Sequence, residues 1–292
     1  MRKVKRIGVI GCLIGLAWTP SYGQKPEDIL DQMAKTYKQA RSIQIEQINK
    51  TDVYIKSAQR EQRGHSEYTM VFLVDRPNKL RVETLQNGKP MPGVGRIFCN
   101  GRQLYIENPN IRQTLRRLAP DDLKQIYTLE NLRYAESTSS GFDPVMLMAL
   151  GDWRPLVESP KLIGRERIEG RDCYRIRAKV KNDYMLNPVF ERPIYEDVWI
   201  GVKDHLIWRI TVSMRVKQRE GEQVITVTGI ISKQIVDKPI PTSRFEYRLP
   251  AGFRFSSLPE RRNPFDEGAV ITSLLDCSTA NLTNFRTPSP TP

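Results

Sequence analysis

The spacing of apolar residues predicts one helix near the start of the chain, followed by strands over most of the remaining length. From Pro26 onward, apolar side chains recur every three or four residues, which is the period of a helix with one buried face. The residues on this face are Ile29, Leu30, Met33, Ala34, Tyr37 and Ala40. From Ser42 the period changes to two, which is typical of strands that bury one side.

Two segments of the predicted sheet show this alternation most clearly, and a hairpin follows them. In the first segment, one face carries Tyr68, Met70, Phe72 and Val74. In the second, the apolar side chains of Tyr174, Ile176, Ala178 and Val180 alternate with the basic side chains of Arg175, Arg177, Lys179 and Lys181. The hairpin joins Val198–Val202 to Leu206–Val216 and places Trp208, Ile210, Val212, Met214 and Val216 on one side. The sequence therefore predicts a sheet with one apolar face and one cationic face.

Turn and helix signals complete the predicted fold. Asn87-Gly88 and Asn100-Gly101 are typical of two-residue hairpin turns, in which both central residues need positive φ. Short helices are predicted from Pro120 and from Asp143, and further strands at Val224–Ile231 and Phe245–Leu249. A sheet of this size must cover its apolar face, and it can do so by curling around the helices. The predicted fold class is α+β, with a large curved antiparallel sheet that forms an incomplete, half-open β-barrel covered by a few helices.

The first 23 residues have the pattern of an export signal. Basic residues precede an apolar run from Ile7 to Trp18, which is shorter than the roughly 20 residues that span a bilayer. Val9-Ile10-Gly11-Cys12 resembles a bacterial lipobox, but the apolar run continues past Cys12, so a cleaved signal peptide at 1–23 is favoured over lipid anchoring. We expect the mature protein in the periplasm or cell envelope, with one domain over 24–255 and a C-terminal extension over 256–292 that ends in a partly disordered tail.

The charge of the chain narrows the class of partner. Its 46 Lys and Arg residues and 33 Asp and Glu residues give a formal net charge of +13, which falls to +9 without the four basic residues of the leader. An exported basic protein meets anionic lipid head groups, envelope polymers or acidic proteins, and we expect no nucleic acid partner. Peripheral or transient membrane contact fits this charge, and a solvated surface that aids solubility is the alternative.

Residues that carry chemistry are sparse. Ser139-Ser140-Gly141 lacks the Gly-x-Ser-x-Gly frame of a nucleophile elbow. The candidate acidic residues, Glu83, Glu166, Glu169 and Asp172, lie in charge-rich strands or turns, where solvated carboxylates are expected. His65 and His205 are far apart and are expected at the surface. The sequence predicts no enzyme activity, no catalytic residue, no metal site and no cofactor.

Cysteine usage leaves the disulfide question open. Cys99, Cys173 and Cys277 remain after removal of the leader, and export permits a disulfide. Three cysteines allow three different single pairings, and the sequence does not choose among them.

Several ordered motifs resemble those of the periplasmic carrier of outer-membrane lipoproteins and its relatives (the LolA-like superfamily), some of which bind lipids or sense mislocalised lipoproteins. The motifs are Arg76-Pro77-Asn78-Lys79-Leu80-Arg81, the segment Asn100–Asn110 with Gln113 after it, Gly164–Tyr174, the Trp199 hairpin and Phe245–Phe253. Together with the leading helix, the likeness spans about residues 26–255. The chain is longer and far more basic than the type carrier, so it is most similar to uncharacterised exported relatives.

The resemblance implies a half-open barrel whose apolar cavity receives the acyl chains of a lipid or lipoprotein. The candidate cavity residues are Phe72, Leu80, Val82, Leu104, Ile106, Trp199, Trp208, Ile210, Val212 and Met214, and an ordinary solid core is the alternative for them. The candidates for an anionic head group are Arg175, Arg177, Lys179 and Arg209. We expect a carrier or chaperone; the alternative is a lipid-sensing regulatory or interaction domain that reports to an envelope membrane protein.

Overall fold

A computed structural model of the chain describes residues 24–57, 61–123, 125, 153–181, 190–218 and 221–256. The predicted signal peptide, most of the segment predicted as two helices after Pro120, and the C-terminal extension after Ser256 lie outside these residues. No helix in the described segments combines the length and apolarity needed to cross a bilayer.

The predicted leading helix is confirmed as α1 (Pro26–Gln39). Pro26 suits the first helical turn because its missing N–H would have no partner there, and Glu27 and Asp28 favour the positive end of the helix dipole. The helix ends where Ala40 adopts an extended conformation. Its buried residues are Ile29, Leu30, Met33, Ala34 and Tyr37, so the apolar stripe seen in the sequence is the stripe that packs.

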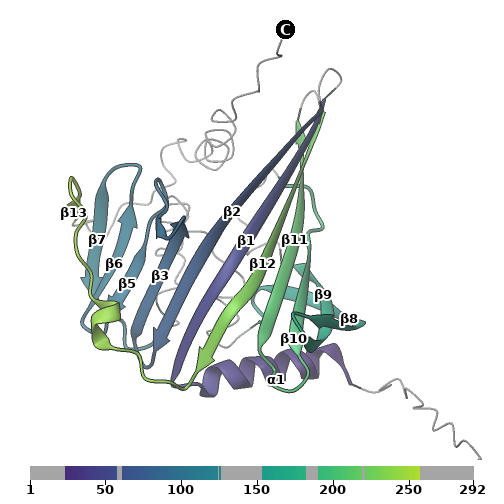
Figure 1. Cartoon of the computed structure of the whole chain (residues 1–292), viewed down its shortest axis with the longest axis horizontal. Helices are drawn as coiled ribbons and strands as arrows, with labels where there is room; N and C mark the ends of the chain where they lie inside the picture. Colours follow the sequence, from purple (N-terminus) through teal and green to yellow (C-terminus); the bar gives the residue numbers. More distant parts are fainter. Residues whose placement is uncertain are drawn as a thin grey trace, which may run out of the picture.

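The strands form one large sheet (Figure 1). They are β1 (Ser42–Ser57), β2 (Glu61–Asp75), β3 (Lys79–Gln86), β4 (Lys89–Pro90), β5 (Ile97–Asn100), β6 (Gln103–Asn108), β7 (Gln113–Leu118), β8 (Val157–Ile168), β9 (Arg171–Val180), β10 (Tyr195–Gly201), β11 (Ile207–Gln218), β12 (Gly221–Val236) and β13 (Arg254–Ser256). The order is β13-β7-β6-β5-β3-β2-β1-β12-β11-β10-β9-β8, with β4 beside β3. All neighbours are antiparallel except β13 and β7, which are parallel. The end strands β13 and β8 each have a single neighbour and do not pair with each other, so the sheet is open. Figure 1 shows that the sheet is curved.

The two faces of the sheet follow from the strand registers. Ile43 and Ile45 of β1 lie opposite Val74 and Phe72 of β2, and all four are buried beneath α1. We call this side the inner face and the opposite side the outer face. On β9 the predicted apolar row of Tyr174, Ile176, Ala178 and Val180 is buried and on the inner face, while the basic residues alternate with it on the outer face.

Residues 237–256 form a strap that crosses the outer face between β12 and β7 (Figure 1). The strap contains the short 3₁₀ helix η2 (Thr242–Phe245), and Phe245 packs with Ile240 against Val71 and Leu73 in a second apolar cluster. Further along the strap, Tyr247 stacks on Tyr105 of β6, with ring centroids 4.5 Å apart. The predicted strand at Phe245–Leu249 is therefore wrong. The backbone of this segment pairs with no neighbouring strand, and the side chains of Phe245 and Tyr247 pack on the outer face of the sheet.

The two Asn-Gly signals both mark turns, but by different means. Asn87 and Gly88 both have positive φ, 53° and 74°, as a type I′ turn requires. At the second turn only Gly101 has positive φ. There the side-chain oxygen of Asn100 accepts hydrogen bonds from the backbone N–H groups of Arg102 and Gln103, each at 2.9 Å, and closes the turn between β5 and β6.

Candidate functional site

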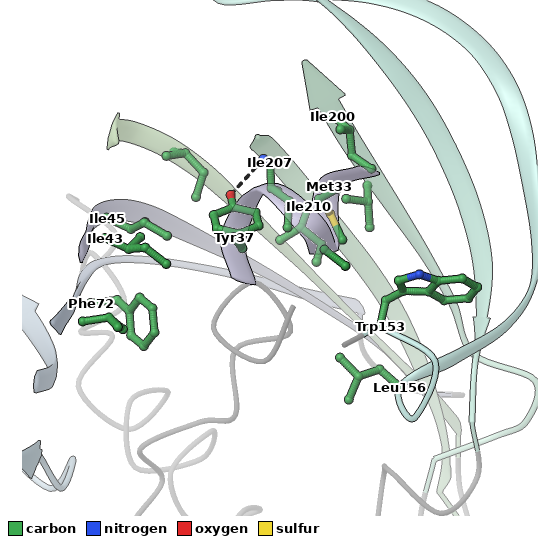
Figure 2. Close-up of a cluster of buried hydrophobic side chains, with 14 of the residues drawn as sticks. Met33, Tyr37, Ile43, Ile45, Phe72, Trp153, Leu156, Ile200, Ile207 and Ile210 are labelled. Atoms are coloured by element: carbon green, nitrogen blue, oxygen red, sulfur yellow. Dashed lines mark hydrogen bonds between the residues drawn. The ribbon is translucent and has the colours of Figure 1, made fainter. Parts of the chain in front are cut away.

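The inner face beneath α1 is a packed core. Figure 2 shows Met33 and Tyr37 of the helix pointing toward Ile207 and Ile210 of β11. The Tyr37 hydroxyl accepts hydrogen bonds from the backbone N–H of Ile207 at 3.0 Å and from Nε2 of Gln234 at 2.6 Å. Burial raises the pKa of Tyr37 to about 12, and these two hydrogen bonds oppose the rise only in part. At this end of the sheet, α1 is fixed by both apolar packing and a buried polar anchor.

Most of the predicted cavity residues share the inner face. Phe72, Leu80, Val82, Leu104, Ile106 and Ile210 are buried and belong to one apolar cluster. Val212 and Met214 continue the same row on β11 but are only half-buried. The structure thus brings eight of the ten together, and their role in ligand binding stays a prediction.

A half-buried apolar surface continues beyond α1, where β1, β11 and β12 project away from the helix (Figure 1). We call it the distal stripe; it consists of Val53, Ile55, Val212, Met214, Ile225 and Val227. The registers join these residues across strands, because Val53 pairs with Ile225 and Ile225 pairs with Met214. Sequence reasoning named only the two residues on β11, since a period of two shows which side is apolar but not where the covering helix ends.

The other two predicted cavity residues, Trp199 and Trp208, are buried in the same apolar cluster, but their predicted place in the inner-face row is wrong. Trp199 pairs with Arg175 and Arg209, which puts it on the outer face. Its ring lies between their guanidinium groups, 5.0 and 4.7 Å from the ring centroid, and its Nε1 donates to Glu166 at 2.8 Å. The tryptophan ring is buried by arginine stems and not by a cavity wall.

Trp208 is displaced by a bulge. Arg209 pairs with Trp199 and Ile207 pairs with Ile200, so Trp208 is an extra residue on β11. Ile207 takes the place beneath α1 that simple alternation assigns to Trp208 (Figure 2). The Trp208 ring instead lies 3.7 Å from the guanidinium of Arg171, and its Nε1 donates to Asp204 at 3.1 Å.

The four head-group candidates lie on the outer face, across the sheet from the apolar residues. Asp197 accepts hydrogen bonds from Arg175 at 2.7 Å and from Arg177 at 2.8 Å, and Lys179 pairs with Glu158 at 2.7 Å. Arg209 stacks on Trp199. Burial would raise the pKa of Asp197, but the two arginines outweigh it and lower that pKa below its ordinary value. Binding a head group here requires these ion pairs to open, and the role stays a prediction.

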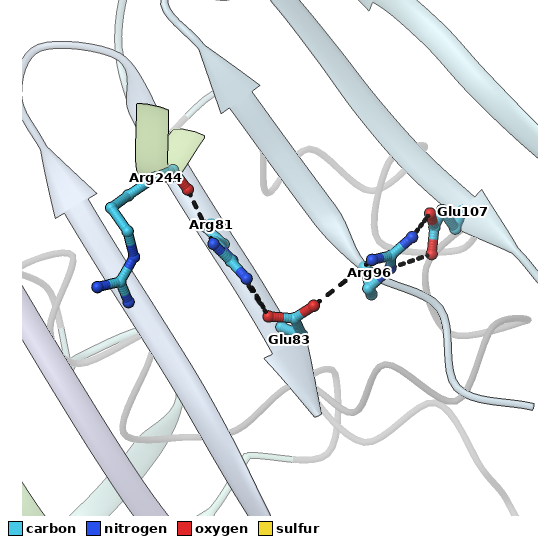
Figure 3. A network of polar contacts seen from close by, with 5 residues as sticks. All are labelled: Arg81, Glu83, Arg96, Glu107 and Arg244. Atoms are coloured by element: carbon cyan, nitrogen blue, oxygen red, sulfur yellow. Dashed lines mark hydrogen bonds and ion pairs between the residues drawn. The ribbon is translucent and has the colours of Figure 1, made fainter. Parts of the chain in front are cut away.

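A second arginine–carboxylate network lies under the strap (Figure 3). Arg81 pairs with Glu83, and Arg96 bridges Glu83 to Glu107, with 2.6 Å between Arg96 and Glu107. The expectation that Glu83 is solvated is wrong, since Glu83 is 4% exposed. Burial would lower the pKa of Arg96, but the hydrogen bond and charges of Glu107 and Glu83 raise it. Alternation could not reveal this burial, because the cover comes from a distant part of the chain.

The remaining candidate groups are the cysteines and histidines. Among the described residues, no three metal-ligating side chains come together. Cys99 and Cys173 are buried free thiols, and burial raises the pKa of Cys173 to about 11. Cys277 lies outside the described residues. His65 is exposed, as expected, and lies 2.8 Å from Asp52, while His205 is half-buried at the tip of the β10–β11 hairpin.

The comparison with known families identifies the relatives of this chain. A family described as "Predicted periplasmic protein (DUF2092)" matches residues 26–255. The chain belongs to this family. Membership of DUF2092 confirms an exported protein of the periplasm, as the leader and the sequence resemblance indicate. No curated protein matches the chain.

Several solved structures are similar to this DUF2092 chain at low sequence identity. One is a LolA superfamily protein from Nitrosomonas europaea, with 13% identity, 77% of this chain and 99% of that chain covered, and a TM-score of 0.30. Another is the lipoprotein LppX of Mycobacterium tuberculosis, with 13% identity, coverage of 75% and 100%, and a TM-score of 0.37. A third is the MucA/MucB complex of Pseudomonas aeruginosa, with 13% identity, coverage of 73% and 99%, and a TM-score of 0.23. The family match over residues 26–255 confirms the span of the sequence resemblance and its assignment to an exported, periplasmic family.

Proposed function

We propose that this protein binds the acyl chains of a lipid or lipoprotein on the inner face of its sheet and carries them within the periplasm. The observation that supports this is the distal stripe, an apolar surface continuous with the core and only half-buried. Contiguous apolar surface that stays partly exposed is typical of sites that a ligand or partner covers. An extended acyl chain has the elongated shape needed to lie along this row of apolar side chains, which spans β1, β12 and β11.

The energetics favour reversible binding without chemistry. Each buried methylene contributes about 0.8 kcal/mol, so roughly ten methylenes supply about 8 kcal/mol before the cost of association is subtracted. This is enough for capture, and small enough for release to an acceptor with greater affinity. The proposed mechanism is that the chain packs on the distal stripe and replaces water there, with no cofactor and no catalytic step.

A charge placed on the stripe tests the proposal. Met214→Glu puts a carboxylate among the apolar side chains, and we expect it to abolish binding of a fluorescent acyl phospholipid while the fold is retained. Ser213→Glu is the matched control, because Ser213 is exposed on the opposite side of the same strand, where its hydroxyl lies 3.1 Å from that of Thr226. A folded Met214→Glu protein that binds the lipid as the wild type does contradicts the proposal.

Transfer between vesicles separates carriage from sensing. A carrier moves the labelled phospholipid from donor to acceptor vesicles at a rate that rises with protein concentration, whereas a sensor binds the lipid without delivering it. The basic surface adds a second expectation, which is that binding to anionic vesicles weakens as salt rises. Binding that is independent of salt removes the head-group role of the outer-face cations.

A further inference from the structure

Two buried amide side chains lie on the inner face between the core under α1 and the distal stripe. Gln47 and Asn49 are two residues apart on β1, so they share this face, and each is only 2% exposed. Nε2 of Gln47 donates a hydrogen bond to Oδ1 of Asn49 at 2.7 Å. On this face of β1, the apolar Ile45 precedes the pair, and Thr51 and then the apolar Val53 follow it. An amide pair in this setting needs a reason, because buried polar groups cost free energy unless they are fully hydrogen-bonded.

The neighbouring strand is shaped to hold this pair. Gly229 of β12 lies opposite Asn49, and a Cβ atom there would come within 2.4 Å of Nε2 of Gln47 and 3.0 Å of Oδ1 of Asn49. Any side chain at this position would push the amides off the sheet. The absence of a side chain at Gly229 therefore gives the amide pair its place.

One amide nitrogen of the pair has no acceptor for its N–H groups within the described part of the chain. Nδ2 of Asn49 is shielded from solvent and has no hydrogen-bond acceptor among the residues that the structure describes. An amide nitrogen carries two N–H donors. Most buried side-chain donors in proteins are paired, and an unmet donor destabilises the state that contains it. A ligand that brings an acceptor oxygen to this nitrogen lowers that penalty in the bound state by pairing one of the N–H groups.

We propose that Asn49 donates this hydrogen bond to the carbonyl oxygen of the ester or amide that joins an acyl chain to its head group. The inference rests on the proposed function and narrows its ligand to acyl chains that carry a carbonyl. The chain then follows the distal stripe, because Val227 lies opposite Thr51, the next inner-face residue of β1, and Ile225 lies opposite Val53. A plain hydrocarbon gains the same apolar contacts and leaves the donor unmet, so the site discriminates against it.

Two probes of equal chain length test the inference, methyl laurate with an ester carbonyl and dodecane with none. Asn49→Leu replaces the amide by an apolar group of similar size. We expect it to weaken binding of methyl laurate about tenfold and to leave binding of dodecane unchanged or tighter. Thr226→Val is the matched control, since Thr226 lies on the outer face of β12 beside Ser213, away from the proposed path of the acyl chain, and it is expected to alter neither affinity.

Infrared spectroscopy provides a second readout that needs no variant. The carbonyl stretch of methyl laurate bound to the wild type is expected at lower wavenumber than in an alkane solvent, because a hydrogen bond weakens the C=O bond. A band at the alkane position overturns the inference, as does an Asn49→Leu protein with unchanged affinity for methyl laurate. In both cases the wild type still binds the probes and the proposed function stands. If the wild type binds neither probe, the proposed function fails and this inference fails with it.

Discussion

The two wings of the sheet are covered on opposite faces. The helix wing consists of strands β8–β11. Here α1 packs on the inner face, and outer-face side chains such as Arg177 are exposed to solvent. On the strap wing, strands β3–β7, residues 237–256 cross the outer face. Each cover is held by a tyrosine: the buried Tyr37 bonds to Ile207 and Gln234, and the half-buried Tyr247 bonds to Thr114 at 2.8 Å. Which face is hidden thus depends on where the chain's covering segments lie, and not on the strands themselves.

The two arginine–carboxylate networks show what this difference does. Both arise from basic and acidic residues that alternate outward along neighbouring strands. Under the strap, the side chains of Glu83 and Glu107 are 5% and 4% exposed. On the helix wing, those of Glu166 and Arg177 are 40% and 46% exposed. Equivalent pairs should therefore be costly to break on one wing and cheap on the other, since a buried charge left without its partner is strongly destabilising.

The largest expected effect is the loss of a carboxylate under the strap. Glu107→Ala leaves Arg96 without the partner that it contacts through two nitrogens, at 2.6 and 2.8 Å, and we expect a loss of about 3–5 kcal/mol in the free energy of unfolding. Glu166→Ala on the open wing is the control and is expected to cost less than about 1 kcal/mol. Denaturation in urea measures both. Equal losses at the two positions would show that the strap does not shield its network.

A smaller effect is expected from the anchor of α1. Tyr37→Phe leaves the buried N–H of Ile207 without an acceptor, which should cost about 1–3 kcal/mol in unfolding free energy. It should also alter the alkaline limit of stability. Because the folded pKa of Tyr37 is about 12 and its ordinary value is 10.0, its contribution is complete below pH 10 and is lost as the pH rises through 12. Urea titrations of both proteins across this range should show a flatter pH dependence for the variant; parallel curves would exclude Tyr37 as the cause.

The anchor of the strap should matter less. Tyr247→Phe removes the hydrogen bonds of this hydroxyl to Thr114 and Glu107 but keeps the ring that stacks on Tyr105, and Glu107 retains Arg96 as its partner, so we expect a loss of about 1 kcal/mol. The same urea denaturation measures it, with Tyr37→Phe as the reference. A loss larger than that of Tyr37→Phe would mean that the strap depends on its polar anchor more than α1 does. Such a result would reverse the present ranking of the two covers.

The sequence predicts the strands and their faces well, but not their covers. Alternation identified the inner rows of β2 and β9, and the three- and four-residue spacing identified α1, because each pattern is a local consequence of backbone geometry. Trp208 was misplaced because a single extra residue on β11 reverses the face, and no sequence signal marks it. The prediction of a strand at Phe245–Leu249 is wrong because the apolar side chains of the strap pack across strands that lie far away in the sequence. Local alternation contains no information about such packing.

The site was predictable only in part for the same reason. The apolar row that includes Ile210 and Met214 follows from alternation on one strand. The distal stripe requires three strands in register, and the Asn49 donor is notable only once Gly229 and Gln47 are seen beside it. An asparagine, a glutamine or a glycine considered alone in the sequence does not indicate a ligand.

The smallest expected effect concerns acid and the open wing. Asp197 has a folded pKa below its ordinary value of 3.8, because Arg175 and Arg177 favour its charged form. Its contribution is therefore present above pH 3.8 and is lost as the pH falls through the lower folded value.

Asp197→Asn should cost about 0.5–1 kcal/mol in unfolding free energy near neutral pH, since the arginines are partly solvated. The gap in unfolding free energy between the variant and the wild type should close in acid. High salt should narrow the gap as well, by screening the exposed partners. Urea denaturation of the two proteins, at neutral and acid pH and with or without salt, measures this. A gap that persisted in acid and in salt would mean that Asp197 stabilises the wing through packing and not through charge.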